Sequence, residues 1–270
     1  MPRGRFPLRA AALAAACLLV VSGCGKDEVD PDVDPQQVDA VEAPEVGACR
    51  NLGPDDVSQP SNAGKVVDCA GTHTAETYAV GELPTTFDDV DYDDKELGTY
   101  AYRTCSDAFE KFLGADESLV MRTVVSWAWF RPSEKAWDKG ARWYRCDVVG
   151  GGEQSQEFVP LPETAKGLLL GRPKDRWMVC VAGPSVAGNV KVPCSQKHNW
   201  RAVTTIKVGQ EADEYPGDRV VQAKTQEFCS DSVGAWLNYP VDYDFAYTWF
   251  HEAEWQAGNR RSVCWARTRQ

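Results

Sequence analysis

VDCAGTH, from Val67 to His73, recurs as VPCSQKH, from Val192 to His198, so the chain carries one V-x-C-x3-H pattern twice. A run of β character follows each copy, at 77–83 and 202–208. Shared residues in a shared order indicate an internal duplication.

Further matches extend the duplication on both sides of this element. In chain order they are Cys49 with Cys180, Cys105-Ser106-Asp107 with Cys229-Ser230-Asp231, Trp129-Phe130 with Trp249-Phe250, and Trp137, Gly140, Arg142 and Cys146 with Trp255, Gly258, Arg260 and Cys264. A Gly-rich polar stretch, 150–156, separates the two copies. The sequence therefore predicts two tandem homologous domains, 47–150 and 177–270, joined by a linker at 151–176.

Each copy holds four cysteines in the same order, which predicts disulfides if the protein is exported. No two of them stand at C-x2-4-C spacing, so zinc and iron–sulfur sites are poor alternatives. The third cysteine of each copy falls on a helix and the others on short segments of β character. We expect the first to pair with the second across neighbouring strands, and the third with the fourth between helix and sheet. The predicted pairs are Cys49–Cys69, Cys105–Cys146, Cys180–Cys194 and Cys229–Cys264.

One amphipathic helix is expected in each copy. Residues 94–113 place an apolar stripe on one helical face, and Gly114 follows as a stop signal. Residues 218–237 repeat this pattern, with six residues on the stripe: Val221, Phe228, Cys229, Val233, Trp236 and Leu237. The predicted fold class is α+β: two tandem homologous domains, each a small antiparallel sheet packed on one main helix and held by two disulfides.

The N-terminus has the organisation of an export signal. Three arginines precede an apolar run at 10–21, which is shorter than the roughly 20 residues a spanning helix needs. Val21-Ser22-Gly23-Cys24 resembles the bacterial lipobox, which implies a signal peptide at 1–23 and a diacylglyceryl, palmitate-bearing Cys24. The alternative is an ordinary secretory signal with a chance cysteine. Two or more acyl chains would anchor the protein stably to membrane lipid on the outer face of the cell membrane.

The residues after Cys24 are strongly acidic. The stretch 25–46 contains eight acids, one Lys and no aromatic residue, so we expect a disordered stalk at 24–46. Without residues 1–23 the chain has 26 basic and 40 acidic residues, a net charge of −14. Nucleic acid is excluded as a partner on this ground, because phosphate binding needs concentrated Lys and Arg.

The V-x-C-x3-H element, the Cys-Ser-Asp of each helix and the W-x2-G-x-R-x3-C ending together resemble the septum-formation domain of exported, membrane-anchored actinobacterial proteins. The resemblance covers 46–150 and 177–268. Family members usually carry Glu three residues after the His; Glu76 keeps that position, whereas Arg201 replaces it in the second copy. The resemblance implies an extracytoplasmic module linked to cell division, and it supplies no catalytic residues.

Candidate binding residues come from the matched positions. His73 and His198 could ligate metal or titrate, but a structural role bonding loop backbone beside the disulfide is favoured. Arg142 and Arg260 are expected to stack on Trp137 and Trp255, or to form a binding platform for carboxylates or sugars with them. The remaining candidates, if exposed, are Trp127, Trp129, Trp200 and Trp249.

The function expected is a non-catalytic binding or assembly module of the cell envelope, with an envelope protein or the cell wall as partner and no metal or cofactor. The first alternative is a carbohydrate- or peptidoglycan-binding lipoprotein that uses exposed Trp. The second is an enzyme with an unrecognised site near His73 and Glu76. A flat row of exposed Trp would favour sugar binding, whereas burial of all ten would favour protein partners.

Overall fold

The computed structural model describes residues 33–152 and 154–268, which belong to one compact unit. The predicted signal peptide and Cys24 lie outside the described residues. Within the part of the chain that is described, no helix is long and apolar enough to cross a membrane.

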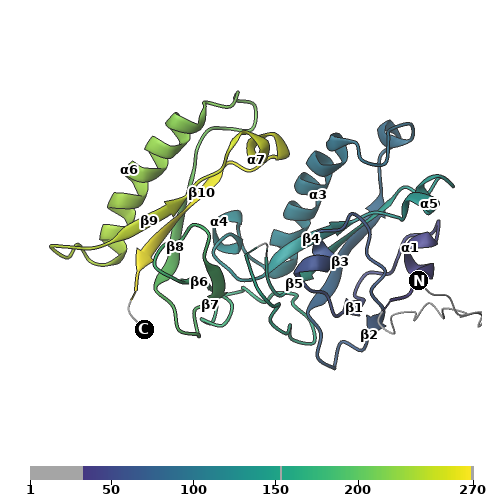
Figure 1. Ribbon diagram of the computed structural model, residues 1–270, viewed down its shortest axis with the longest axis horizontal. Coiled ribbons are helices and arrows are strands. Elements are labelled where there is room, and N and C mark those ends of the chain that lie inside the picture. The colour runs from purple at the N-terminus through teal and green to yellow at the C-terminus, as the bar shows by residue number, and fades with distance from the viewer. Residues whose placement is uncertain (1–32, 153, 269–270) are drawn as a thin grey trace, which may run out of the picture. The chain divides into compact units, whose positions relative to one another are not determined.

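Two five-stranded antiparallel sheets form the framework, one in each repeat, and Figure 1 shows both. Their strand orders are β2-β1-β3-β5-β4 and β7-β6-β8-β10-β9. The orders correspond strand for strand, so the predicted α+β fold with two tandem copies is confirmed. The strands are β1 (Cys49–Arg50), β2 (Val66–Val67), β3 (Ala75–Glu82), β4 (Ser126–Phe130), β5 (Trp143–Val149), β6 (Val179–Ala182), β7 (Val190–Pro193), β8 (Trp200–Lys207), β9 (Phe245–Thr248) and β10 (Arg261–Arg267).

One long helix packs on each sheet, α3 (Lys95–Leu113) in the first repeat and α6 (Asp218–Trp236) in the second. Asp94 caps α3 by accepting a hydrogen bond from Glu96 N, and Gly114 ends it in the left-handed conformation, at φ 73°. Both helices lie where the sequence predicts them. The shorter helices are α1 (Gln36–Asp39), α2 (Pro54–Val57), α4 (Glu117–Val120), α5 (Glu134–Trp137), α7 (Glu252–Ala257) and a 3₁₀ turn, η1 (Thr85–Phe87).

The core stripe predicted for α6 is wrong at two positions. Phe228 and Trp236 are 37% and 49% exposed. The residue matching Trp236 in the first repeat is Phe112, which packs against Tyr78 and whose carbonyl accepts a hydrogen bond from Gly167 N. No such segment covers the end of α6 in the described part of the chain, so its outer apolar residues face solvent.

The two repeats share a strand register as well as a strand order. In the first, Thr77 pairs with Asp147 and Ala79 with Cys146, which leaves Tyr78 in a bulge. In the second, Ala202 pairs with Trp265 and Thr204 with Cys264, with a matching bulge. Residues at matched positions therefore occupy equivalent places on the two sheets.

All four predicted disulfides are present. Cys49–Cys69 and Cys180–Cys194 join neighbouring strand segments, with Cα atoms 5.3 and 4.9 Å apart. Cys105–Cys146 and Cys229–Cys264 join α3 to β5 and α6 to β10. Both of these helix–sheet bridges have fully buried cysteines.

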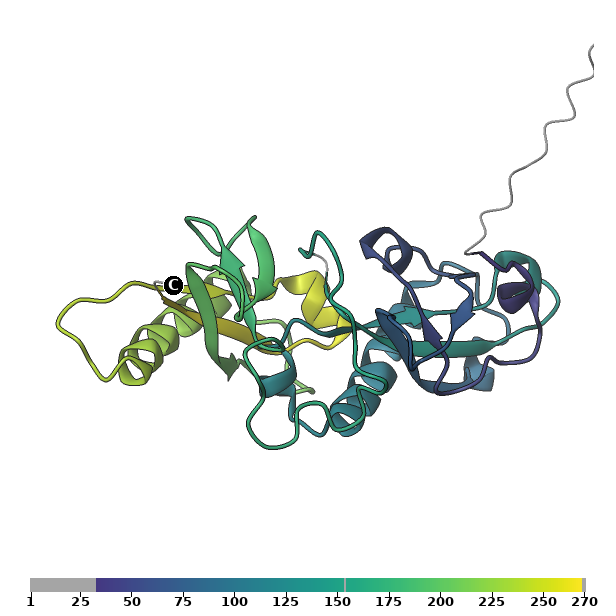
Figure 2. The same cartoon turned by 90° about the horizontal axis from the view of Figure 1, so that it is seen from below.

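The predicted disordered stalk is wrong for 33–40, because this part of the segment packs on the first repeat, whereas most of 41–46 is exposed. Figure 2 shows it in purple along that repeat. Val38 is buried, Asp39 accepts a hydrogen bond from Lys135 Nζ at 2.5 Å, and the Trp143 indole donates to Ala40 O. Contacts to residues distant in sequence offset the chain entropy that the acidic composition alone cannot offset.

The linker at 151–176 is also more ordered than its polar, Gly-rich start suggests. Its apolar residues Leu161, Ala165 and Leu169 are buried in a core cluster that includes residues of both repeats. Leu161 N donates to His73 O, and Leu169 N donates to Leu113 O. The segment is therefore a packed element of the molecule, and not a free tether.

Candidate functional site

The two matched histidines have the same local structure. His73 Nδ1 lies 3.0 Å from Gly71 O, and His198 Nδ1 lies 2.7 Å from Gln196 O. Both rings are buried. Nδ1 needs a proton to donate to a carbonyl oxygen, and neither Nε2 has a hydrogen-bond partner among the described residues. This geometry agrees with the structural role favoured from the sequence.

Glu76 does not form an acid–base pair with His73. One of its carboxylate oxygens accepts from Thr164 Oγ1 at 2.8 Å, and the other accepts from Ala165 N at 2.6 Å. The carboxylate therefore holds the linker. Its counterpart Arg201 bonds Asp175 and keeps the pKa of that carboxyl below its ordinary value.

Arg142 and Arg260 stack on tryptophan in both repeats, as expected. The guanidinium carbon of Arg142 lies 4.0 Å from the centre of the Trp137 ring, and that of Arg260 lies 3.6 Å from the Trp255 ring. Each arginine also donates to the carbonyl oxygen of its own tryptophan. The pair fastens the short helix, α5 or α7, to the strand that follows it.

Replacing Arg142 or Arg260 by Ala should lower the free energy of unfolding by about 1–3 kcal/mol. The stacking contributes about 0.5–2 kcal/mol and each net hydrogen bond about 1 kcal/mol. Urea unfolding measures the change. Arg142→Lys is the informative comparison, because it keeps the charge but loses the planar stack, and Arg219→Ala, on the exposed face of α6, is the control. Wild-type stability in both Ala variants would contradict the structural role.

The tryptophans do not form an exposed row. Trp200 is buried, and Trp127, Trp129 and Trp249 are half-buried. Trp236, at 49% exposure, is the one tryptophan of the described chain that is classed as exposed. This distribution removes the main structural support for a sugar-binding platform of aromatic rings.

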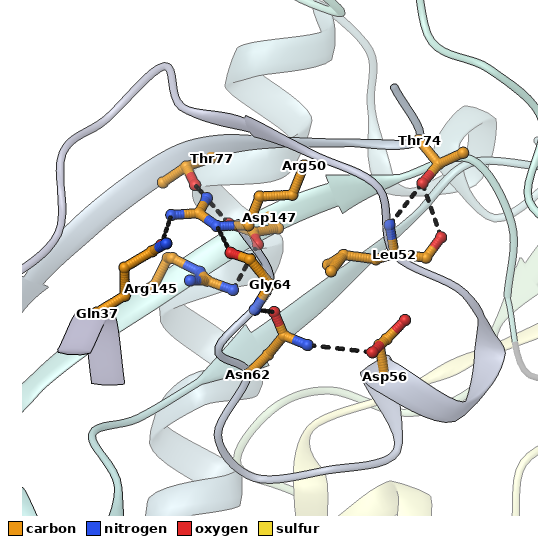
Figure 3. A network of polar contacts seen from close by, with 10 residues as sticks. All are labelled: Gln37, Arg50, Leu52, Asp56, Asn62, Gly64, Thr74, Thr77, Arg145 and Asp147. Atoms are coloured by element: carbon orange, nitrogen blue, oxygen red, sulfur yellow. Dashed lines mark hydrogen bonds and ion pairs between the residues drawn. The ribbon is translucent and has the colours of Figure 1, made fainter. Parts of the chain in front are cut away.

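A buried charged network in the first repeat was missed by the sequence reasoning, and Figure 3 shows it. Arg50 Nη1 donates to Thr77 Oγ1 at 2.8 Å, and Thr77 Oγ1 donates to Asp147 Oδ1 at 2.7 Å. Arg145 Nη2 lies 3.0 Å from Asp147 Oδ2. Arg50 and Arg145 are 1% exposed and Asp147 is 0% exposed. We call these four residues the arginine network.

The second repeat has no such network at the equivalent places. Because the registers match, Arg50, Thr77, Arg145 and Asp147 correspond to four buried apolar residues, Val181, Ala202, Val263 and Trp265. The fold is therefore compatible with an apolar core at these positions. The sequence does carry a signal of this difference: charged residues flank the fourth cysteine of the first repeat (RCD, 145–147), whereas apolar residues flank that of the second repeat (VCW, 263–265).

The arginine network carries two cations and one anion in a buried place. Burial and the neighbouring Arg145 lower the pKa of Arg50 to about 10, against the raising effect of Asp147. Arg145 Nε and Nη2 have no hydrogen bond of good geometry among the described residues, although Nη2 is within ion-pair distance of Asp147. Among the described residues, the network therefore holds one more positive charge than negative charges.

A cavity of about 550 Å³ adjoins the network. It lies between the segment 37–48 and the strands β1 and β2, and Gln37, Arg50, Val66 and Val67 are among its lining residues. We call it the Arg50 cavity. In the described residues no group of three or more His, Cys, Asp or Glu side chains could hold a metal ion.

Comparison with known protein families shows to which family the chain belongs. A family model described as Septum formation matches residues 9–131 and, a second time, 122–264. The chain belongs to the Septum formation family. The two matches confirm the tandem arrangement of this Septum formation protein, although β5 of the first sheet follows the end of the first match. No curated protein and no solved structure matches the chain.

Proposed function

We propose that this Septum formation protein is a lipoprotein, anchored through Cys24 outside the cell membrane, that acts as a non-catalytic binding or assembly module in septum formation. The two family matches carry the proposal, since together they span residues 9–264 and suggest a role in septum formation or the cell envelope. Four disulfides are consistent with an extracytoplasmic protein.

The side chains singled out from the sequence are engaged within the fold, which argues against catalysis at these positions. Nδ1 of His73 and His198, the carboxylate of Glu76 and the guanidinium groups of Arg142 and Arg260 are all engaged with nearby backbone or side-chain groups. A general acid or base needs a free polar group within reach of a substrate. None of these groups is presented in that way.

The docked segment shortens the tether that the sequence suggests. Eight residues separate Cys24 from Val33, where the described structure begins. Nine extended steps between these two residues reach at most about 30 Å. A module held this close would act on partners in or just above the membrane.

Cys24→Ser should move the protein from the membrane fraction to the soluble exported fraction. The thiol is the acceptor for diacylglycerol, and no helix of the described residues is long and apolar enough to span a membrane in its place. Fractionation and metabolic labelling with palmitate measure the effect. Cys17→Ser, which lies inside the predicted signal peptide, is the matched control and should remain labelled and membrane-bound. Equal labelling of the Cys24→Ser protein would contradict the anchor.

Crosslinking in cells tests the partner half of the proposal. The lipidated protein should capture envelope or division proteins at the septum, and it should do so more than the Cys24→Ser protein. Even distribution around the cell, with no septal enrichment of captured proteins, would contradict a role in septum formation.

A further inference from the structure

We propose that the Arg50 cavity binds a short extended peptide segment that ends in a free α-carboxylate and carries a cationic group a few residues before that end. The inference rests on the proposed binding function and names the chemistry of the ligand. It would place the carboxylate at the arginine network and the cationic group at the cavity mouth.

The charge of the network is the first argument. Arg50 donates to three neutral oxygens: Gly64 O at 3.2 Å, Thr77 Oγ1 at 2.8 Å and Gln37 Oε1 at 3.4 Å. Asp147 is the one carboxylate in the network, and it lies 3.0 Å from Arg145. A second carboxylate would neutralise the remaining charge, and charge-assisted bonds are stronger than those to neutral oxygen.

Comparison of the repeats is the second argument. A buried ionic network gives little stability relative to an apolar core of similar volume. The second repeat has that apolar core on the same register, with Val181 in place of Arg50. Folding therefore does not explain two buried arginines in the first repeat, whereas recognition of an anion does.

We place the ligand carboxylate where the side-chain amide of Gln37 now contacts Arg50. Its amide oxygen accepts the longest of the three contacts from Arg50, and Gln37 belongs to the cavity lining. The residue lies on α1, a helix of one turn. A ligand carboxylate that displaces this amide would replace a long neutral contact with a charged one.

The other residues that line the Arg50 cavity indicate an extended peptide backbone and a cationic group for the rest of the ligand. β2 is an edge strand that pairs with β1 on one side, and Val66 is 54% exposed. An edge strand can bond the backbone of an added extended peptide, while neighbouring pockets take its side chains. Glu42 and Glu45 are exposed and also line the cavity. Two acids repel a fully anionic ligand and favour a cationic group at this end.

The test uses the mature full-length lipidated protein in detergent and two matched tetrapeptide libraries, each with Lys at the first position. One library has free C-terminal carboxylates, and the other has C-terminal amides. We expect the protein to retain members of the acid library at least about tenfold more strongly than their amides. Equal retention, or retention of neither library, would overturn the proposal.

Four variants locate the site. Arg50→Val, which introduces the residue of the second repeat, should lose the preference for the acid, whereas Arg219→Val on α6 should keep it. Gln37→Ala should strengthen binding severalfold, because no amide has to be displaced. Replacing Glu42 and Glu45 together by Gln should weaken binding of the Lys peptides. Thermal unfolding of each variant shows that it is folded, and unchanged binding by folded Arg50→Val would exclude this cavity.

The result separates the inference from the proposed function. If Arg50→Val still captures envelope proteins at the septum but wild type shows no carboxylate preference, the module binds elsewhere and only the inference fails. If capture itself is absent while peptides bind, the proposed function fails.

Discussion

Replacing Asp147 by Ala is expected to lower the free energy of unfolding by about 3–5 kcal/mol. Asp147 is the one carboxylate of the arginine network, which also holds two buried guanidinium groups. It accepts a hydrogen bond from the Thr77 hydroxyl as well. Its removal leaves Arg50 and Arg145 as adjacent buried cations without the carboxylate between them. Urea unfolding, followed by far-UV circular dichroism, measures the loss.

Asp244→Ala is the matched control, because Asp244 and Arg267 form a shorter ion pair on the surface. Their contact is 2.6 Å, against 3.0 Å for Arg145 and Asp147, but both side chains are more than half exposed. Solvent screening limits such a pair to about 0–1 kcal/mol. A large loss in the surface variant, or a loss under about 1 kcal/mol for Asp147→Ala, would contradict the importance of burial.

A second variant separates the cost of unpaired charge from the loss of packing. The triple change Arg50→Val, Arg145→Val and Asp147→Leu removes all three charges from the network and leaves Thr77, whereas the second repeat is apolar at all four places. It should recover much of the stability lost by Asp147→Ala, since a packed apolar core can replace an ionic one at little cost. A triple variant as unstable as the single one would show that the network has a structural role the repeat comparison does not reveal.

Local chemistry made the helices and the disulfides predictable. Asp94 and Gly114 mark the ends of α3 through their preferred backbone roles, and these roles depend on neighbours within one turn. The duplication then supplied an independent second copy of each signal. Stacking of Arg142 on Trp137 was predictable for the same reason, because spacing and residue type recur together in the second repeat.

The arginine network was not predictable from either copy alone. Thr77 and Asp147 are neighbours only because β3 and β5 pair with a bulge at Tyr78, and a shift of one residue would place them on opposite faces. Arg50 and Arg145 also belong to a residue type that is almost never fully buried. Knowledge of the register, and not of composition, is what identifies them as core residues.

The order of 33–40 escaped prediction because the interactions that hold it are long-range. Acidic composition describes the segment itself, whereas Lys135, which bonds Asp39, is far away in sequence. The hydrogen bond to Lys135 lowers the pKa of Asp39, so the carboxylate is favoured in the docked state. A disorder estimate based on the segment alone cannot include such a partner.

Removing the Cys105–Cys146 disulfide by a double change to Ala should cost about 4 kcal/mol of unfolding free energy. The bridge closes 41 residues of chain between α3 and β5, and both cysteines are fully buried. The Cys49–Cys69 disulfide closes a shorter loop, with a sequence separation of 20. Changing both of these cysteines to Ala should therefore cost about 3 kcal/mol of unfolding free energy. Denaturant unfolding of the two variants measures both losses.

The effect of Cys105→Ala with Cys146→Ala should extend beyond the first repeat. Cys105 and Cys146 belong to the core cluster that also contains Val181, Trp200 and Trp265 of the second repeat. Shared packing couples the stability of its members, so one cooperative transition is expected at lower denaturant, seen alike by far-UV circular dichroism and by tryptophan fluorescence. If the two probes separate, and the second repeat keeps its wild-type midpoint, the repeats fold independently and the shared core contributes little to their stability.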